Sequence, residues 1–220
     1  MSRPTFVYVY DALCSWCYGF DTVMAQVERD YSDRADLVLV SGGMNVGDRR
    51  RRIQEVLGPD YRAIYANVIE RSGADISEAY LGGLVGRDNH VVDSLRPAVA
   101  LSVFRSDPGR AKRQLAFVTA MQTGMYRDGL DPGEDAYYRT AAEAFSLDPY
   151  AFLAQMTEQA FIDDARGDFA LTQALGVAGF PNLSLRDETG TRYLSVSRGF
   201  APYDDIAPII DMALDRINDG

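Results

Sequence analysis

The chain holds two cysteines, Cys14 and Cys17, both inside the segment VYVYDALCSWCYGF, which also carries the only tryptophan, Trp16. Two thiols at this spacing could bind a metal, form a structural disulfide or carry out redox chemistry. A disulfide between them would close a loop too small to constrain the unfolded chain much. An apolar content of 47% can build a core without such a link. A structural disulfide is therefore a poor explanation of the pair.

A metal site would need two further ligands. The sequence has no third cysteine, and its one histidine, His90, lies far along the chain in GRDNHVVD, where we expect a loop. Cysteines from a second copy of the chain could complete a metal site, whereas redox chemistry needs only the two thiols present. We therefore favour redox chemistry and expect neither a bound metal nor a tightly held cofactor.

The segments around the cysteines predict a strand, a helix and a second strand. Residues Thr5–Tyr10 are rich in β-branched and aromatic side chains, which is typical of a buried strand. A helical pattern follows from Cys17, and Leu37–Val40 forms a short apolar strand that ends at Gly42-Gly43. A strand–helix–strand unit makes the two strands parallel. It also places the cysteines in the turn before the helix.

At a helix N-terminus, unpaired N–H groups and the macrodipole favour negative charge, so we expect the thiolate form of Cys14 to be stabilised. Cys17, one turn later, should lie deeper, which makes Cys14 the nucleophile and Cys17 the resolving thiol. Asp11, three residues before Cys14, could assist proton transfer or cap the turn, and capping is the commoner role. We expect Trp16 at the exposed rim of a peptide-binding surface.

The rest of the chain divides into a helical middle and a mixed tail. Strand patterns are missing from about residue 48, and helix signals follow at Asp93-Ser94, from Leu115 to Met125 and at Asp148-Pro149. The tail predicts a helix from about Asp163 to Leu175, a hairpin of Asn182–Asp187 with Arg192–Ser197, and a helix over Pro202–Ile217. We therefore predict an α/β fold in which residues 1–47 and 160–220 form one discontinuous domain and residues 48–159 form an all-helical insertion.

The segment GVAGFPNLSL places Pro181 between a glycine-flanked turn and an apolar strand. Proline cannot donate to a strand ladder, so it belongs at an edge or at a strand start, and a trans proline would serve for that. The full order is strand, C-x-x-C, helix, strand, then helix, proline, hairpin, helix. This is the order of elements in thioredoxin.

Three segments, YDALCSWCYGF, the GGM of Gly42–Met44 and GFPNL, resemble the DsbA-like thioredoxin proteins. They are most similar to a cytoplasmic branch described as protein disulfide isomerases, and the resemblance spans the whole chain. It implies a thioredoxin-like fold with the insertion between the second strand and the proline loop. It also implies that Cys14 and Cys17 are the redox pair and that Pro181 is a cis-proline facing them. Contacts with substrate would come from Trp16, Phe180, Gly43 and Met44.

DsbA itself has a histidine between its cysteines, where this chain has Ser15-Trp16 and no cation nearby in sequence. We therefore expect a thiol–disulfide oxidoreductase of the reductase or isomerase type. Its partner would be a disulfide-containing protein or a small thiol, with glutathione or a thioredoxin-type thiol as electron donor. Two other functions stay open. One is a glutathione-dependent kappa-type transferase or isomerase, which would not need Cys17. The other is a non-catalytic DsbA-like protease adaptor.

The formal charge of −10 argues against nucleic acid or an anionic membrane as partner. The run Arg49–Arg52 is the exception, and we expect it to form the solvated face and first turns of a helix.

No apolar stretch approaches the ~20 residues of a membrane span, and no signal peptide precedes the first strand. These features predict a cytoplasmic protein, in a compartment where a lone C-x-x-C is more often catalytic than structural.

Overall fold

The computed structural model describes residues 3–87 and 90–218. Its strands, in chain order, are β1 Thr5–Tyr10, β2 Asp36–Ser41, β3 Arg51–Arg52, β4 Val91–Val92, β5 Asn182–Arg186 and β6 Tyr193–Arg198. Its α-helices are α1 Ser15–Tyr31, α2 Ile53–Leu57, α3 Tyr61–Ser72, α4 Leu95–Arg105, α5 Pro108–Ala111, α6 Gln114–Tyr126, α7 Asp135–Ala144, α8 Pro149–Gln155, α9 Gln159–Ala174 and α10 Tyr203–Asn218. A 3-10 turn covers Gly47–Arg49 and a π-helical segment covers Ala79–Leu84.

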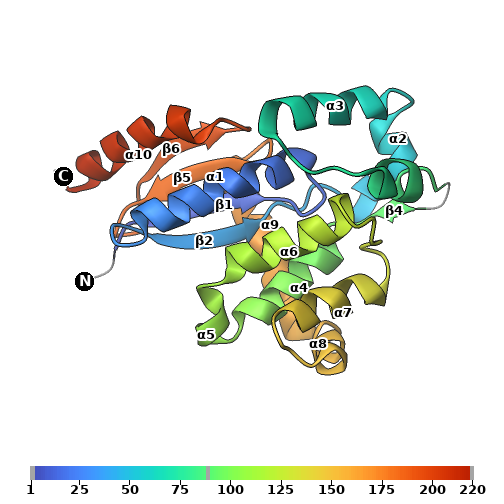
Figure 1. Ribbon diagram of the computed structural model, residues 1–220. Helices are drawn as coiled ribbons and strands as arrows, with labels where there is room; N and C mark the ends of the chain where they lie inside the picture. The colour runs from blue at the N-terminus through green and yellow to red at the C-terminus, as the bar shows by residue number, and fades with distance from the viewer. Residues whose placement is uncertain (1–2, 88–89, 219–220) are drawn as a thin grey trace.

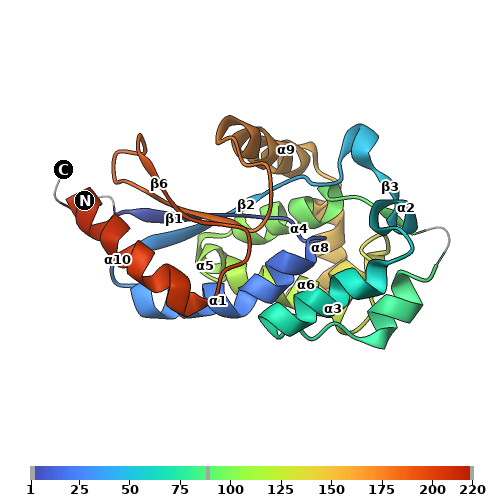
Figure 2. The ribbon, with the colours of Figure 1, turned by 90° about the horizontal axis from the view of Figure 1, so that it is seen from above.

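A four-stranded sheet in the order β2-β1-β5-β6 forms the centre of the fold (Figure 1). β1 and β2 are parallel, as the strand–helix–strand pattern predicts, and β5 runs antiparallel to both β1 and β6. Helices α1 and α10 cover one face of the sheet, and α9 lies against the other (Figure 2). This is the predicted α/β fold of thioredoxin type, and every residue of β1 is buried at its centre.

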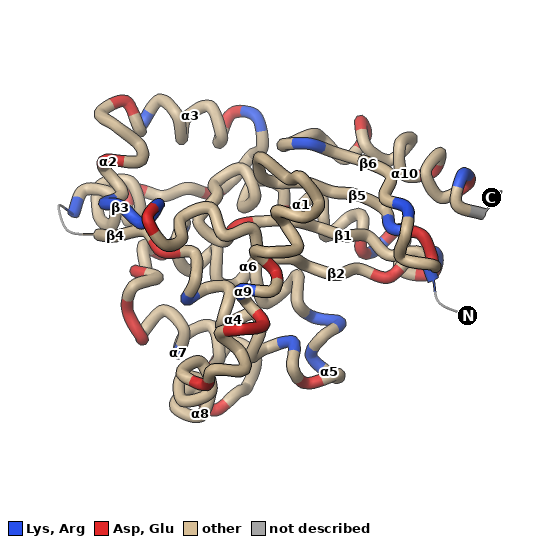
Figure 3. Tube along the Cα trace, turned by 180° about the vertical axis from the view of Figure 1, so that it is seen from behind, with Lys and Arg blue, Asp and Glu red and all other residues tan. Residues whose placement is uncertain are grey.

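The chain between β2 and α9 carries α2–α8, as the sequence predicts, but it is not wholly helical. The short strands β3 and β4 pair antiparallel, Arg51 with Val92 and Arg52 with Val91. The arginine run is exposed as expected, and blue segments mark it beside β3 in Figure 3. Its assignment to a helix start is wrong, because α2 begins only at Ile53. We propose the division into residues 1–47 with 160–220 and an insertion of residues 48–159.

One continuous apolar cluster joins the sheet to the helices between β2 and α9. Tyr8 of β1 packs against Phe20 of α1, with ring centres 5.8 Å apart. Deeper among the helices, Phe104 of α4 stacks on Phe117 of α6 at 4.1 Å. Because the cluster is shared, the helices of the insertion and the sheet hold each other in place.

β2 is an edge strand, and a side chain from α6 completes its free edge. The Leu39 N–H donates to Gln114 Oε1 at 3.2 Å, and Gln114 Nε2 donates to the Leu37 carbonyl at 3.0 Å. The Gln114 side chain thereby satisfies one donor and one acceptor that a neighbouring strand would otherwise pair.

Arg105 of α4 forms a second link to the same edge. Its guanidinium donates to the Leu39 carbonyl at 3.1 Å and to both carboxylate oxygens of Asp168 on α9, at 3.0 and 3.1 Å. Asp168 in turn accepts from the Ser41 N–H at 2.9 Å. Helices α4 and α9 and the end of β2 therefore share one hydrogen-bond network. The loop that follows β2 carries Met44, whose N–H bonds to Asp11 in the turn before Cys14.

We predict that Gln114→Ala lowers the free energy of unfolding by about 1–3 kcal/mol, because it leaves a backbone donor and acceptor of β2 unpaired. Urea denaturation would measure the change. Gln173→Ala is the matched control, since Gln173 is an exposed residue of α9 and its removal should change stability by less than about 0.5 kcal/mol. Equal effects of the two substitutions would contradict the role assigned to Gln114.

Candidate active site

Cys14 occupies the N-cap position of α1. The helix begins at Ser15, and Cys14 before it has an extended backbone, with φ −95° and ψ 112°. The Cys14 N–H donates to the Asp11 carbonyl at 3.1 Å, which closes the turn between β1 and α1. The structure thus places the first sulfur at the helix N-terminus, as the sequence predicts. No acidic residue in the first turn of α1 opposes negative charge there.

The two thiols differ in exposure in the predicted order, but by less than expected. Cys14 is 8% exposed and Cys17 is 0% exposed, so Cys14 is recessed rather than freely exposed. Burial, and after it the hydrogen bond and charge of the Cys14 sulfur, raise the pKa of the Cys17 thiol well above its ordinary value. Cys17 therefore stays protonated and shielded, as a resolving thiol should.

The proline loop contacts the first cysteine. The Phe180–Pro181 peptide bond is cis, as the resemblance implies. The Cys14 Sγ lies 3.7 Å from the Phe180 carbonyl oxygen, and the Pro181 carbonyl accepts from the Gly199 N–H at 2.7 Å. The loop and the C-x-x-C turn, 166 residues apart in sequence, thus meet at the Cys14 sulfur.

The glycines after β2 leave room for aromatic rings. A Cβ on Gly42 would overlap with the ring of Phe180, so this glycine sets the depth of the proline loop. Gly43 has φ +67°, and a Cβ there would lie 2.7 Å from the ring of Phe169. Gly43 is buried and Met44 half-buried, so the structure brings both to the site as its support. Their contact with substrate stays a prediction.

Asp11 is a buried hub of hydrogen bonds. Its carboxylate accepts from the Leu13 N–H at 3.0 Å, from the Met44 N–H at 2.7 Å and from the Ser94 hydroxyl at 3.1 Å. Burial raises the pKa of Asp11 although these donors act in the opposite direction. The capping role is confirmed by the bond to Leu13. A part in proton transfer stays a prediction.

Trp16 lies between two side chains that the sequence did not connect with it. Its ring centre is 5.7 Å from that of Phe200, and the Arg71 guanidinium carbon lies 5.4 Å from it. Trp16 is therefore half-buried, and the prediction that its side chain is exposed is wrong. Arg71 lies in the last turn of α3. The insertion therefore supplies a positive charge beside the first turn of α1, where the residues next to the cysteines in sequence supply none.

Asp21 is a buried carboxylate that the sequence reading missed. It lies one helical turn beyond Cys17 on α1, and burial raises its pKa well above the ordinary value. The Gln122 carboxamide, with its nitrogen turned towards Asp21, lies 3.2 Å from both carboxylate oxygens. Only the position of Asp21 on the buried face of the helix could have signalled it in the sequence.

His90 is buried, although it lies in the loop that the sequence predicts. Its Nδ1 lies 3.0 Å from Asp131 in the loop between α6 and α7. In the part of the chain that the structure describes, no three histidine, cysteine, aspartate or glutamate side chains gather as metal ligands would. Among the same residues, no helix is both long enough and apolar enough to cross a membrane.

Solved structures with the same fold are numerous, although no family model and no curated protein matches the chain. The crystal structure named "putative protein disulfide isomerase from Nitrosomonas europaea" is 21% identical and has a TM-score of 0.79. The match covers 97% of this chain and 98% of that one. The arrangement of sheet and helices is therefore that of the DsbA-like thioredoxin fold.

Three further structures, of two proteins, show the range of proteins with this fold. The cytosolic disulfide reductase DsbM from Pseudomonas aeruginosa is 24% identical, with a TM-score of 0.74 over 96% of this chain and 99% of that chain. Its structure with GSH is 25% identical over the same shares of both chains, with a TM-score of 0.69. A 2-hydroxychromene-2-carboxylate isomerase is 14% identical, with a TM-score of 0.64 over 97% and 96% of the two chains. At 14–24% identity, the likenesses to the isomerase, to the Nitrosomonas europaea protein and to DsbM without GSH concern the fold alone.

We predict that iodoacetamide at mildly acidic pH modifies Cys14 before Cys17. Cys14 lies at the helix N-terminus with some exposed surface, whereas the Cys17 thiol is fully buried and its pKa is raised. Peptide mapping by mass spectrometry gives the order, and the Cys14→Ser variant should remain almost unlabelled. Faster labelling of Cys17 would reverse the roles of the two thiols.

Asp21 should make the folded state less stable as pH rises. Its folded-state pKa lies above that of the unfolded chain, so its stabilising contribution is full below the unfolded pKa, near 4, and is lost as pH rises through the folded pKa. We expect Asp21→Asn to gain stability relative to the wild type as the pH rises above about 4, until the pH has passed the folded-state pKa of Asp21. The gain is about 1.4 kcal/mol for each unit of the shift.

Urea unfolding at several pH values tests this expectation. Glu143→Gln is the control, because Glu143 is exposed on α7 and its replacement should leave the difference from the wild type independent of pH within about 0.5 kcal/mol. A pH-independent difference for Asp21→Asn as well would show that Asp21 does not titrate differently in the folded protein.

Proposed function

We propose that the protein is a thiol–disulfide oxidoreductase that acts as a reductase on disulfide-containing proteins or small disulfides. The observation that carries the proposal is the position of the Cys14 sulfur. It lies at the N-terminus of α1, beside a shielded Cys17 and 3.7 Å from the carbonyl that precedes the cis-proline.

The proposed reaction has two exchange steps. The Cys14 thiolate attacks one sulfur of the substrate disulfide, so that a Cys14–substrate bond forms, the substrate bond breaks and the departing sulfur leaves as a thiolate that takes up a proton. Cys17 then loses its proton and attacks the Cys14 sulfur, which releases the second substrate thiol. The protein ends as a Cys14–Cys17 disulfide, and two molecules of a thiol reductant such as glutathione return it to the dithiol.

The site suits an extended substrate as well as a small one. The Phe180 backbone lies beside Cys14 and could accept a hydrogen bond from a substrate strand, as in strand addition. Trp16 and Met44 are half-buried at the same site and would offer apolar contacts. Asp11 would hold the turn and Met44 in place through its hydrogen bonds.

Two comparisons support the reducing direction and a small thiol as electron donor. DsbM is described as a cytosolic disulfide reductase, and one of its structures contains GSH. We therefore propose glutathione or a thioredoxin-type thiol as electron donor, and the cytoplasm as location. An isomerase activity on proteins with wrongly paired disulfides would use the same first step.

Insulin reduction and the trapping of a mixed disulfide test the proposal. We expect the wild type to reduce insulin and glutathione disulfide. Cys14→Ser should lose this activity by at least about a hundredfold. Cys17→Ser should accumulate a mixed disulfide with glutathione on Cys14, visible by mass spectrometry, because nothing then resolves it. Glu143→Gln, on the exposed surface of α7, serves as the unaffected control.

Other outcomes would favour the other two functions. Full turnover by Cys17→Ser with glutathione would point to the kappa-type transferase or isomerase, which the likeness to the chromene-carboxylate isomerase leaves in view. A wild-type protein that reduces no disulfide but binds a protein partner tightly would be an adaptor. In either case the reductase proposal fails.

A further inference from the structure

Three buried tyrosine hydroxyls, those of Tyr8, Tyr126 and Tyr137, have no hydrogen-bond partner within residues 3–87 and 90–218. A buried hydroxyl without a partner destabilises the folded state, because it has lost its hydrogen bonds to water. Such a donor can still serve an acceptor that exists only during the reaction. The surroundings of each hydroxyl show which of them is placed for this.

Tyr8 lies within β1, and its ring packs against α1. Its ring centre is 5.8 Å from that of Phe20, which follows Cys17 by three residues on the helix. Residues three apart share one face of a helix, so Tyr8 meets the face that carries Cys17. Tyr8 and Cys17 are both fully buried, and they belong to the same apolar cluster. The phenol and the resolving thiol are therefore enclosed together between the sheet and α1.

The charges around the three hydroxyls distinguish them. Burial raises the pKa of Tyr8 well above its ordinary value, and the charge of Cys17 is the next cause. Burial also raises the pKa of Tyr126, where the charges of neighbouring tyrosines act more strongly than those of the thiols. For Tyr137, burial is the cause of the raised pKa. Tyr8 is therefore the tyrosine of the three on which a reacting sulfur acts most strongly.

Cys17 changes during the reaction from a weak acceptor to a strong one. Burial raises the pKa of its thiol, so the resting protein holds it protonated, and it must become a thiolate to attack Cys14. A thiol accepts hydrogen bonds weakly, whereas an ionised acceptor forms strong ones. We propose that the Tyr8 hydroxyl donates a hydrogen bond to the Cys17 thiolate as it forms, and thereby speeds the resolving step. This inference rests on the proposed function and adds a residue to its second exchange.

The phenol keeps its own proton in this step. The Cys17 sulfur gives up its proton and bonds to the Cys14 sulfur, while the bond between Cys14 and the substrate sulfur breaks. The electron pair of the broken bond stays on the substrate sulfur, which takes up a proton and leaves as a thiol. Because the pKa of Tyr8 is raised, its hydroxyl stays protonated and can donate throughout. Tyr8 lowers the free energy of the buried charge and exchanges no proton.

Dithiobis(nitrobenzoate), an aromatic disulfide with a coloured leaving thiolate, reports both steps in one absorbance trace. Attack by Cys14 releases one coloured thiolate at a rate proportional to the reagent concentration. Attack by Cys17 on the mixed disulfide then releases a second at a rate independent of that concentration. We expect Tyr8→Phe to slow the second phase about tenfold near neutral pH and to raise its pH midpoint by about one unit, because the thiolate loses a donor. The first phase should change by less than about twofold, since Cys14 faces the proline loop.

The other titratable groups around the thiols are the same in the wild type and in Tyr8→Phe. Those that act on Cys17 or Tyr8 are Cys14, Asp11, Asp21 and Tyr126.

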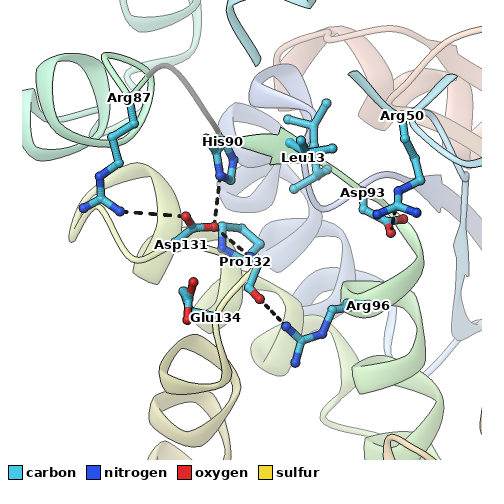
Figure 4. Close-up of a pocket in the computed structure, with 12 residues that line it drawn as sticks. Leu13, Arg50, Arg87, His90, Asp93, Arg96, Asp131, Pro132 and Glu134 are labelled. Atoms are coloured by element: carbon cyan, nitrogen blue, oxygen red, sulfur yellow. Dashed lines mark hydrogen bonds and ion pairs between the residues drawn. The ribbon is translucent and has the colours of Figure 1, made fainter. Parts of the chain in front are cut away.

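Histidine side chains titrate between about pH 5 and 8. His90 lies 3.0 Å from Asp131 in a pocket that Leu13, the residue before Cys14, also lines (Figure 4). The upward shift caused by Tyr8→Phe should therefore persist in a His90→Gln background, and its loss there would contradict the inference.

Tyr137→Phe is the matched control, because it also removes a buried hydroxyl without a partner, but one on α7. Both phenylalanine variants should resist urea at least as well as the wild type, and Tyr137→Phe should leave both phases unchanged. A second phase in Tyr8→Phe that equals that of the wild type, or two phases slowed by the same factor, would overturn the inference. A wild type that shows the first phase alone would instead refute the proposed function, because Cys17 would then resolve nothing.

Discussion

The hydrogen bonds that converge on the buried Asp11 carboxylate hold the active site together. They join three segments that are far apart in sequence: the turn before Cys14 through Leu13, the loop after β2 through Met44, and the start of α4 through Ser94. Burial raises the pKa of this carboxyl, which shows that burying its charge costs free energy. The hydrogen bonds to it offset part of this cost and fix the geometry of the three segments. The turn that carries the nucleophile is thereby anchored to the insertion as well as to the sheet.

The same dependence on the insertion appears along β2. β2 is an edge strand of the sheet, and Gln114 and Arg105 occupy its free edge with side chains from α6 and α4. Asp168 ties the end of β2 to α9. The strand end, its glycines and the proline loop are thus fixed by helices on both sides. Gly42 then decides how closely Phe180, and with it the backbone beside Cys14, can approach.

The charges and the burial that act on the two thiols come from different parts of the fold. The dipeptide between the cysteines brings no charge, but Arg71 from α3 lies against Trp16 in the first turn of α1. Below the surface, Cys17 and Asp21 share the buried face of α1, where burial keeps both protonated forms favoured. The nucleophile, by contrast, faces the proline loop at the N-terminal end of the helix.

The local pattern was enough to predict β1, α1, the parallel β2, the terminal hairpin and the positions of Cys14 and Cys17. Apolar runs rich in β-branched or aromatic residues mark the first two strands, and the 3.6-residue periodicity marks the helix, so each prediction needs neighbouring residues only. The cis form of Pro181 came from the resemblance to DsbA-like proteins, since the surrounding residues also fit a trans bond.

What only the tertiary structure decided are contacts across long sequence distances: Ser94 on Asp11, Arg71 on Trp16, and Gln114 on β2. The sequence predicted an exposed Trp16 and a helix at Arg51, and both were wrong for this reason. A side chain's burial, and the pairing of two extended residues, depend on which distant segment packs against them, and composition and spacing along the chain carry no record of that partner.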